Sequence, residues 1–397
     1  MSRSKQKGRQ MFPVLPRFAA FLAALALTVT GCSNSSSSTE GQSATRTAEA
    51  AESLKGICPD PVVIQSSWWP EAEHGGYYQL LGKNAQVDKS KKLISGPLVI
   101  NGADSGVKLE IRAGGPANNF TPPSTTLYLD RSVMLGGAET DQAVQISKDQ
   151  PVLAVFARME VSPAALMWDP AAHPAFKTIA DIGRTDTKVL YSQGATYMDY
   201  LTGSGILKQS QVDGSYDGTP SRFIAEGGKI AQQGYVTSEV YQYEQELPQW
   251  KRPLAWQLFN DAGFPTYPEA MSIRADRKDE LAPCLRRLVP ALQRSTADYA
   301  ADPKATNELI VNLVKDYGGF EYSLERAQWA VDTMKQHGIL SNGNNGTIGD
   351  FEEDRVQKII DITRPIFASQ HNPIRDGLKP SDLYTNEFID PTIGLQP

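Results

Sequence analysis

The chain has 397 residues, of which 40% are hydrophobic and 21% charged, and its formal net charge at pH 7 is −6. Residues 1–31 carry five positive charges and no acidic residue, so the remainder of the chain has a net charge near −11. Nucleic-acid binding requires a basic face, so this charge argues against a nucleic-acid partner.

The N-terminus has the parts of a bacterial lipoprotein signal. Five basic residues between Arg3 and Arg17 precede an apolar run at 18–29, and small residues then lead into Cys32. The run is shorter than the ~20 residues that a membrane-spanning helix needs. We therefore expect cleavage after residue 31, a lipid on Cys32, and a protein anchored at the extracytoplasmic face of the cell membrane. The alternatives are an ordinary secretion signal or a membrane anchor.

A polar, serine-rich segment follows the lipidation site. Residues 32–57 have the composition of a flexible tether. The remaining ~340 residues suffice for two lobes with a large core.

Two cysteines remain after Cys32. Cys58 and Cys284 lie on the side of the membrane where disulfides persist, so we expect them to form one. Two separate buried thiols are the alternative. The sequence has no Cys-x-x-Cys motif and no His/Cys cluster, so no metal site is expected.

Beyond the tether, short strands alternate with helices. Hydrophobic periodicity predicts strands at 61–64, 107–111, 132–135, 152–156, 164–168, 188–191, 234–237 and 254–259. It predicts helices at 140–147, 196–202, 221–232, 279–299, 304–317, 323–337 and 348–368. Residues 82–125 are rich in Gly, Pro, Asn and Ser and are irregular apart from one strand. The pattern predicts an α/β fold of two lobes with open sheets flanked by helices, with a ligand cleft at the carboxyl ends of the strands.

The loop after the first strand carries the strongest candidate site. Residues 66–78 hold two Trp, two Tyr, two Glu and one His. Aromatic faces stack on flat rings or cations, and carboxylates accept hydrogen bonds from amino groups. The loop therefore predicts an aromatic, amino-bearing or cationic ligand, contacted by Trp68, Trp69, Glu71 and His74. The alternative is that Trp68 and Tyr78 are core residues and the others form a polar rim.

Three later loops are weaker candidates. The loop at 136–139 presents backbone N–H groups and Glu139 before a predicted helix. The next joins a strand to a helix and offers Gln193, Gly194, Ala195, Thr196 and Tyr197, with capping of the helix by Thr196 as an equal alternative.

The third of these loops, 234–239, carries Tyr235 and Glu239. Both residues are predicted to close a pocket from the second lobe. The alternative is a packed tyrosine and an exposed acid.

No set of residues assembles into an enzyme. The sequence has no Gly-x-Ser-x-Gly, Walker A or dinucleotide-binding motif. Of the four histidines, His74 alone falls in a predicted cleft, and no partner for it is evident. We expect no catalytic residue and no cofactor.

The motif Trp68-x-Pro70-x-x-x-His74-x-Gly76-x-Tyr78 resembles the opening motif of a known family. This family joins the fungal thiamine-pyrimidine synthase to bacterial binding proteins for thiamine precursors, riboflavin, sulfonates and nitrate. Residues 234–239 are similar to its tyrosine- and glutamate-bearing segment, and 152–166 and 382–388 look familial too. The resemblance covers roughly residues 60–390.

The resemblance implies a type II periplasmic binding protein. Lobe one would comprise 58–160 and 268–397, and lobe two 161–267. Both remaining cysteines would then lie in lobe one and leave the hinge free. Trp68 would stack on a ring, and His74 and Glu239 would bond its polar substituents.

Two departures from the family matter. The stretch 82–125 is longer and more irregular than the family's usual helix and strand, and it is a candidate to line or cover the cleft. The synthase's cysteine- and glycine-rich iron segment is not evident, which argues against synthase activity.

The expected function is the solute-binding component of an ABC importer. The protein would be a monomer that closes on a small-molecule ligand and delivers it to permease and ATPase subunits. A thiamine pyrimidine precursor leads the list of ligands. Sulfonates and nitrate rank lower because the motif loops hold no Arg or Lys. The alternatives from other classes are a His74-dependent enzyme of thiamine-pyrimidine metabolism and a sensory or structural lipoprotein.

Overall fold

The computed structural model describes residues 53–396. The predicted signal peptide, the lipidation site Cys32 and the tether up to residue 52 lie outside the described residues. Leu54, within the last part of the predicted tether, is buried, and its N–H donates to the Ser105 carbonyl at 2.8 Å. None of the helices in the described range is long and apolar enough to cross a membrane.

The first sheet has seven strands in the order β2-β3-β4-β1-β5-β12-β6. Their bounds are β1 Val62–Gln65, β2 Gln86–Asp88, β3 Leu93–Ile100, β4 Ala103–Arg112, β5 Leu135–Ala138, β6 Val152–Phe156 and β12 Ala270–Arg274. Strand β1 is parallel to β4 and β5, whereas β12 is antiparallel to β5 and β6. Strand β12 returns to this sheet after more than a hundred residues spent elsewhere.

The second sheet has five strands in the order β11-β7-β10-β8-β9. They are β7 Ala164–Trp168, β8 Val189–Leu190, β9 Val212–Asp213, β10 Ala231–Tyr235 and β11 Ala255–Leu258. Strands β8, β9 and β10 are parallel, and β7 is antiparallel to both β10 and β11. The chain crosses from the first sheet to the second at 157–163 and returns at 259–269.

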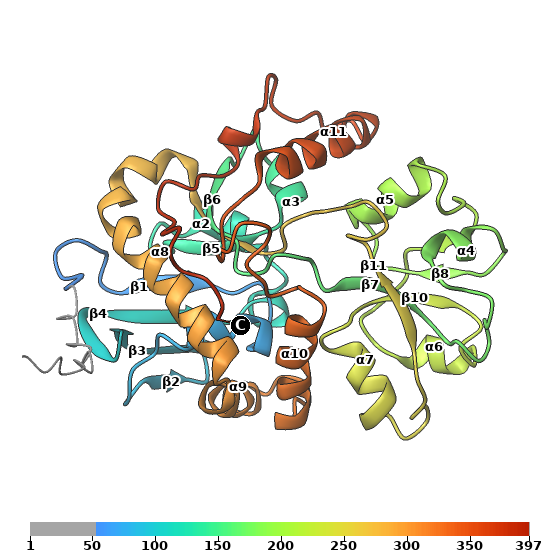
Figure 1. Ribbon diagram of the computed structural model, residues 1–397, viewed down its shortest axis with the longest axis horizontal. Helices are drawn as coiled ribbons and strands as arrows, with labels where there is room; N and C mark the ends of the chain where they lie inside the picture. The colour runs from blue at the N-terminus through green and yellow to red at the C-terminus, as the bar shows by residue number, and fades with distance from the viewer. Residues whose placement is uncertain (1–52, 397) are drawn as a thin grey trace, which may run out of the picture. The chain divides into compact units, whose positions relative to one another are not determined.

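Helices flank both sheets (Figure 1). The helices beside the first sheet are α1 Gly75–Tyr78, α2 Pro123–Leu129, α3 Thr140–Gln145, α8 Lys278–Ala301, α9 Lys304–Tyr317, α10 Leu324–Gln336 and α11 Glu353–Ser369. The helices beside the second sheet are α4 Ile179–Gly183, α5 Thr196–Gly203, α6 Ser221–Ala225 and α7 Glu239–Tyr241. The predicted α/β architecture of two open sheets flanked by helices is confirmed.

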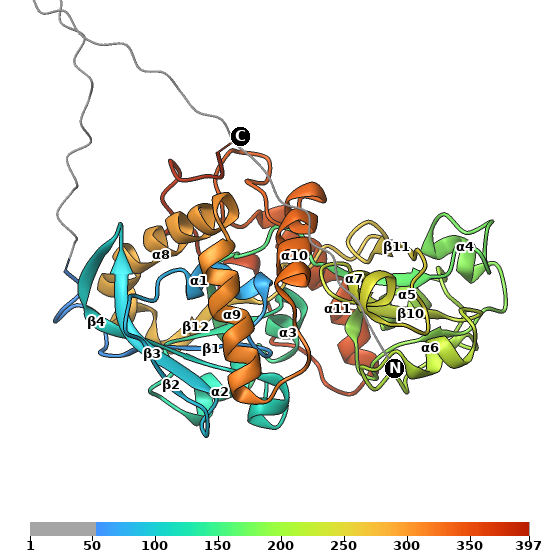
Figure 2. The ribbon, with the colours of Figure 1, turned by 90° about the horizontal axis from the view of Figure 1, so that it is seen from below.

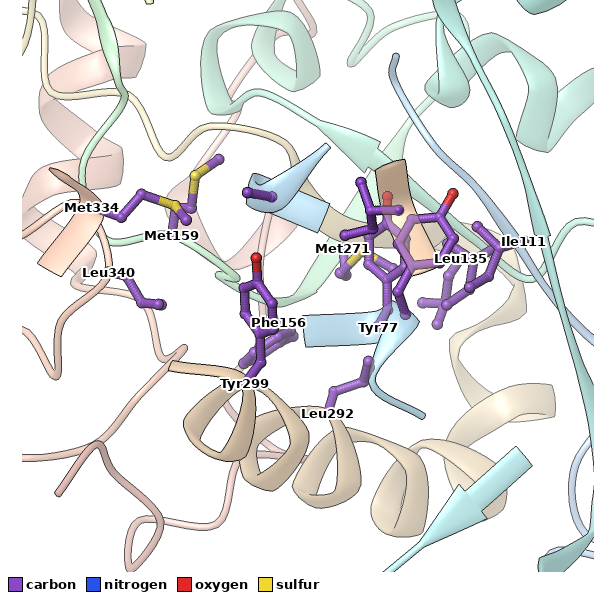
Figure 3. Packing of buried hydrophobic residues seen from close by; sticks show 14 of the residues in the cluster. Tyr77, Ile111, Leu135, Phe156, Met159, Met271, Leu292, Tyr299, Met334 and Leu340 are labelled. Carbon is purple, nitrogen blue, oxygen red and sulfur yellow. The ribbon is translucent and has the colours of Figure 1, made fainter. Parts of the chain in front are cut away.

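The core of the first lobe packs between the sheet and α8. Phe156 of β6 and Met271 of β12 meet Tyr77 of α1 and Leu292 and Tyr299 of α8 (Figure 3). Each of these side chains is at most 4% exposed. Burial of a side chain of this size contributes about 1.5–3 kcal/mol, so this contact fixes α8 against the sheet.

The predicted disulfide is present between Cys58 and Cys284, which are 226 residues apart. Cys58 precedes β1, and Cys284 lies on α8. The bond therefore joins two elements that both pack in the first lobe.

The stretch 82–125 is more regular than predicted. Strands β3 and β4 form a hairpin whose two-residue turn is Asn101-Gly102, both with positive φ. Asn-Gly is the sequence most favoured in this turn because both positions need the left-handed conformation. With β2, the hairpin extends the sheet at its outer edge (Figure 2).

Two other element predictions were wrong. The helix predicted at 221–232 ends at Ala225, and Gly227 and Gly228 follow with φ of +63° and +75°. Glycine adopts this conformation without steric cost, so the pair ends the helix and lets β10 begin at Ala231. The strand predicted at 132–135 begins only at Leu135, so 136–138 belong to β5 rather than to a loop.

Candidate functional site

A cavity of about 410 Å³ lies between the two sheets. Small-molecule sites are typically clefts of ≈ 300–1,000 Å³. The first lobe lines the cavity with Ser67, Pro122, Pro123, Gly137, Glu139, Asp141, Gln142, Gln145 and Glu269. The second lobe lines it with Ala164, Ser192, Gly194, Ala195, Thr196, Tyr197, Gln233, Gly234, Tyr235 and Phe259.

The strand ends explain why these residues meet. Glu139 directly follows β5, residues 192–197 follow β8, and Tyr235 is the last residue of β10. Glu269 precedes β12, which runs antiparallel and so presents its first residue at the same edge. Open α/β sheets place ligands at this edge, as the sequence pattern predicted.

Aromatic side chains form one wall. The ring of Tyr197 stacks on Phe259 with centroids 3.9 Å apart and planes 13° apart. The Tyr197 hydroxyl donates to Gln233, whose Oε1 also accepts from the Ser192 N–H at 2.7 Å. These bonds hold the Tyr197 ring in place, whereas Tyr235 is 41% exposed and offers a free face.

Carboxyl groups form another wall. Glu139, Asp141 and Glu269 line the cavity, and no Lys, Arg or His among the described residues does. Burial, followed by the nearby Asp141 charge, raises the pKa of Glu139 to about 8. Burial also raises the pKa of Asp141, although the Thr266 hydroxyl donates to Asp141 Oδ1 at 2.7 Å and opposes the shift. The cavity therefore favours a positively charged ligand group.

We expect Glu139→Gln to stabilise the empty protein at alkaline pH. In the unfolded chain this carboxyl ionises near pH 4.5, and in the folded protein near pH 8. The folded state thus binds the extra proton, and wild-type stability falls as pH rises through this interval. The glutamine variant lacks that loss, so its advantage over wild type should be about 4–5 kcal/mol larger at pH 9 than at pH 4. Urea unfolding at pH 4 and pH 9 measures this, and an equal difference at both pH values would contradict it.

His74 lies behind the cavity. Its side chain is 1% exposed, and Nε2 lies 3.3 Å from Ser67 Oγ, 3.4 Å from Glu269 Oε2 and 3.7 Å from Glu71 Oε1. Burial, and then the charge of Arg158, lower the pKa of His74 well below its usual value. The neutral ring thus makes polar contacts rather than ion pairs at neutral pH.

Arg158 connects the two crossover segments. It is 6% exposed and lies in the outgoing segment, where its guanidinium pairs with the Glu269 carboxylate at the end of the return segment. Its Nε also donates to the Glu269 carbonyl at 3.3 Å, and Nη1 donates to the Glu73 carbonyl. The guanidinium of this buried arginine therefore bonds to groups of the protein, and Arg158 does not line the cavity.

Half of the predicted site residues line the cavity. These are Glu139, Gly194, Ala195, Thr196, Tyr197 and Tyr235. Six others do not line it: Trp68, Trp69, Glu71, His74, Gln193 and Glu239.

Packing accounts for the two tryptophans, and a local hydrogen bond accounts for Glu239. Trp69 is an 8%-exposed core residue, and Trp68 lies on Gly115 and Phe120. Glu239 Oε2 accepts from the Tyr235 N–H at 2.8 Å, so it holds the backbone beside the cavity.

One alternative interpretation of the loops is wrong. Ala195 is the N-cap residue of α5, and no side chain caps this helix. Thr196 is the first helical residue and lines the cavity instead.

Sequence reasoning missed Asp141, Gln233, Phe259 and Glu269. Asp141 had a signal, because it follows Glu139 by two residues in the first turn of a predicted helix. No sequence signal marked Glu269, because strand β12 was not predicted and the residue pattern did not show that the chain returns to the first sheet. The stretch 82–125 contributes only its end, Pro122 and Pro123, to the cavity.

Comparison with known proteins gives a fold but no sequence relative. Neither a family model nor a curated protein matches the sequence. A solved protein from Bordetella bronchiseptica RB50 is 13% identical over 83% of this chain and 96% of its own, with a TM-score of 0.50. The periplasmic aliphatic sulphonate binding protein SsuA from Escherichia coli is 14% identical over 80% and 89%, with a TM-score of 0.49.

A Candida albicans gene product, described as exhibiting the generic periplasmic binding protein fold, aligns at 12% identity over 77% and 95%, with a TM-score of 0.39. The chain shares the fold of the Bordetella bronchiseptica protein, with two open α/β sheets joined by two crossover segments. In this fold, the cavity between the two sheets and the two crossover segments beside it are the candidate ligand cleft and hinge.

Proposed function

We propose that this protein is the extracytoplasmic solute-binding component of an ABC importer. The observation that carries this is the cavity of about 410 Å³, lined from both sheets at the edge where two crossover segments join them. A ligand in that position contacts both lobes and therefore favours the closed arrangement. The lipid on Cys32 would keep the protein at the membrane, where a permease and an ATPase complete the importer.

We propose lobe boundaries at 58–160 with 268–397, and at 161–267. The strands of each sheet fall within these ranges. Contacts between α10 and the second lobe cross the proposed boundary. Arg326 pairs with Glu246, and Trp329 Nε1 donates to the Val236 carbonyl at 3.3 Å.

The ligand we propose is a small flat nutrient that bears an amino or cationic group, with a thiamine pyrimidine precursor as the leading candidate. Tyr197 and Tyr235 supply ring faces, and Glu139 supplies an acceptor for amino groups. A sulfonate or nitrate would face Glu139, Asp141 and Glu269 without a basic partner on the cavity wall within the described part of the chain.

Binding rather than catalysis is favoured. A general base must reach its substrate within hydrogen-bond distance, and His74 is 1% exposed and does not line the cavity. A His74-dependent enzyme therefore has weaker support than a binding protein.

Thermal unfolding against a ligand panel tests the proposal. The panel comprises aminopyrimidines, thiamine, riboflavin, taurine, alkanesulfonates and nitrate. A ligand at 100 times its dissociation constant should add about 2.7 kcal/mol, or a few degrees of unfolding temperature. If no compound stabilises folded, unliganded protein, the proposed nutrient class is wrong.

Tyr235→Ala should weaken the binding of the stabilising compound about tenfold, because it removes a stacking face. Tyr235 is 41% exposed, so the variant should fold normally. Leu129→Ala is the matched control, since Leu129 is 74% exposed and does not line the cavity. Equal affinities of Tyr235→Ala and the control would remove the cavity as the binding site.

A further inference from the structure

Two of the three carboxyl groups that line the cavity have no positively charged partner among the described residues. Glu269 pairs with Arg158, but neither Glu139 nor Asp141 has an ion pair with any described residue. Asp141 is 6% exposed, and its carboxyl group is held by the Thr266 hydroxyl. Burying two ionised carboxylates without a counter-ion is costly, so the empty cavity favours a proton on this pair, and a cation would take the place of that proton.

We propose that Glu139 and Asp141 form a cation subsite, and that the ligand is a flat organic cation whose ammonium, amidinium or protonated ring nitrogen sits against this pair. This inference rests on the proposed function. It narrows the proposed ligands from compounds with an amino or cationic group to compounds that carry a positive charge. Asp141 becomes a specificity-determining residue that the sequence pattern did not single out.

The titratable groups that line the cavity together with Glu139 support this assignment. They are Asp141 from α3, Tyr197 from α5, Tyr235 from β10 and Glu269 from the return crossover. None of them is a cation. The Arg158 guanidinium bonds to the Glu269 carboxylate and to the Glu73 carbonyl, so its charge is not available to neutralise Glu139 or Asp141.

The aromatic wall defines the shape of the cation. Tyr235 offers an exposed ring, and the stacked pair Tyr197 and Phe259 stands beside it. Aromatic faces attract cations through their quadrupole and also stack on flat ligands. A planar delocalised cation satisfies both the rings and the carboxyl pair.

Binding should release a proton from the protein. The pKa of Glu139 is raised to about 8, so this group is mostly protonated at pH 7 in the empty cavity. A cation beside it favours the carboxylate and lowers that pKa. Affinity for the cation should therefore rise with pH up to about 8 and then level off.

Isothermal titration with three flat probes of similar size tests the subsite. Benzamidine is a cation, benzamide is neutral and benzoate is an anion at pH 7. We expect benzamidine to bind at least tenfold more tightly than benzamide, and benzoate not to bind. Titrations of benzamidine in two buffers of different ionisation enthalpy should show a proton released on binding.

Glu139→Gln should abolish the proton release and reduce the preference for benzamidine over benzamide about tenfold. Asp141→Asn should reduce the preference without abolishing the release. Glu353→Gln, an exposed position in the first turn of α11, is the matched control and should behave as wild type.

Two outcomes overturn the cation subsite. One is binding of benzamide or benzoate as tight as that of benzamidine, and the other is no binding of benzamidine at all. If a compound of the nutrient panel still stabilises the protein, the solute-binding function stands and only the cation subsite fails. If nothing in the panel stabilises it, the proposed nutrient class fails as well.

Discussion

Cys284→Ser should lower the free energy of unfolding by about 4–5 kcal/mol. The bond to Cys58 closes a loop of 226 residues, and the entropy that such a crosslink removes from the unfolded chain grows with loop length. Ligand affinity should not change, because both cysteines lie in the first lobe and neither lines the cavity. Urea unfolding and ligand titration measure the two quantities.

The matched control is the reciprocal variant. Cys58→Ser should cause the same loss as Cys284→Ser, and the double variant should lose no more than either one, because all three lack a single bond. Reduction of the wild type should reproduce the loss. A double variant much less stable than the singles would mean that packing at Cys284, which is 1% exposed, causes the effect.

Arg158→Met should lower the free energy of unfolding by about 3–5 kcal/mol. The change leaves Glu269 without its buried counter-charge and the Glu73 and Glu269 carbonyls without a donor. Removing one partner of a buried pair is costly because the other charge remains desolvated. Arg131→Met is the control, since Arg131 is 74% exposed in its pair with Glu280 and should lose less than 1 kcal/mol.

A double variant separates the charge from the packing. Arg158→Met with Glu269→Gln removes both charges, and we expect it to be more stable than Arg158→Met alone. Because Glu269 lines the cavity and Arg158 pairs with it, the same variants should also change the ligand dissociation constant. If Glu269→Gln gives no recovery, the pair does not carry the stability that we assign to it.

The side chains that the resemblance to the thiamine-precursor family singled out do not line the cavity. The motif implied that Trp68, His74 and Glu239 contact the ligand. In the structure, His74 is enclosed by Ser67, Glu71 and Glu269, and Trp68 lies against Gly115. Their roles in the ligand-bound protein stay a prediction.

A local pattern says which residues share a loop, whereas their orientation depends on distant segments. A Cβ on Gly115 would lie 2.4 Å from the Trp68 ring, and a Cβ on Gly114 would lie 2.2 Å from the Ser66 carbonyl. These two glycines let the stretch 82–125 pack against the first loop and occupy the face of Trp68. No spacing within residues 66–78 could reveal this.

The sequence by itself determined the α/β class, most strands and helices, the disulfide and three of the loops at the cavity. Apolar periodicity, the number of cysteines and the position of loops after predicted strands are visible in the order of the residues alone. Only the tertiary structure decided that β12 returns to the first sheet with Glu269 and that Arg158 binds this carboxylate. It also decided that Asp141 and Glu139 line one cavity with no cationic partner among residues 53–396. Those facts follow from contacts between segments far apart in the chain, where burial sets the charge of each group and the sequence gives no measure of burial.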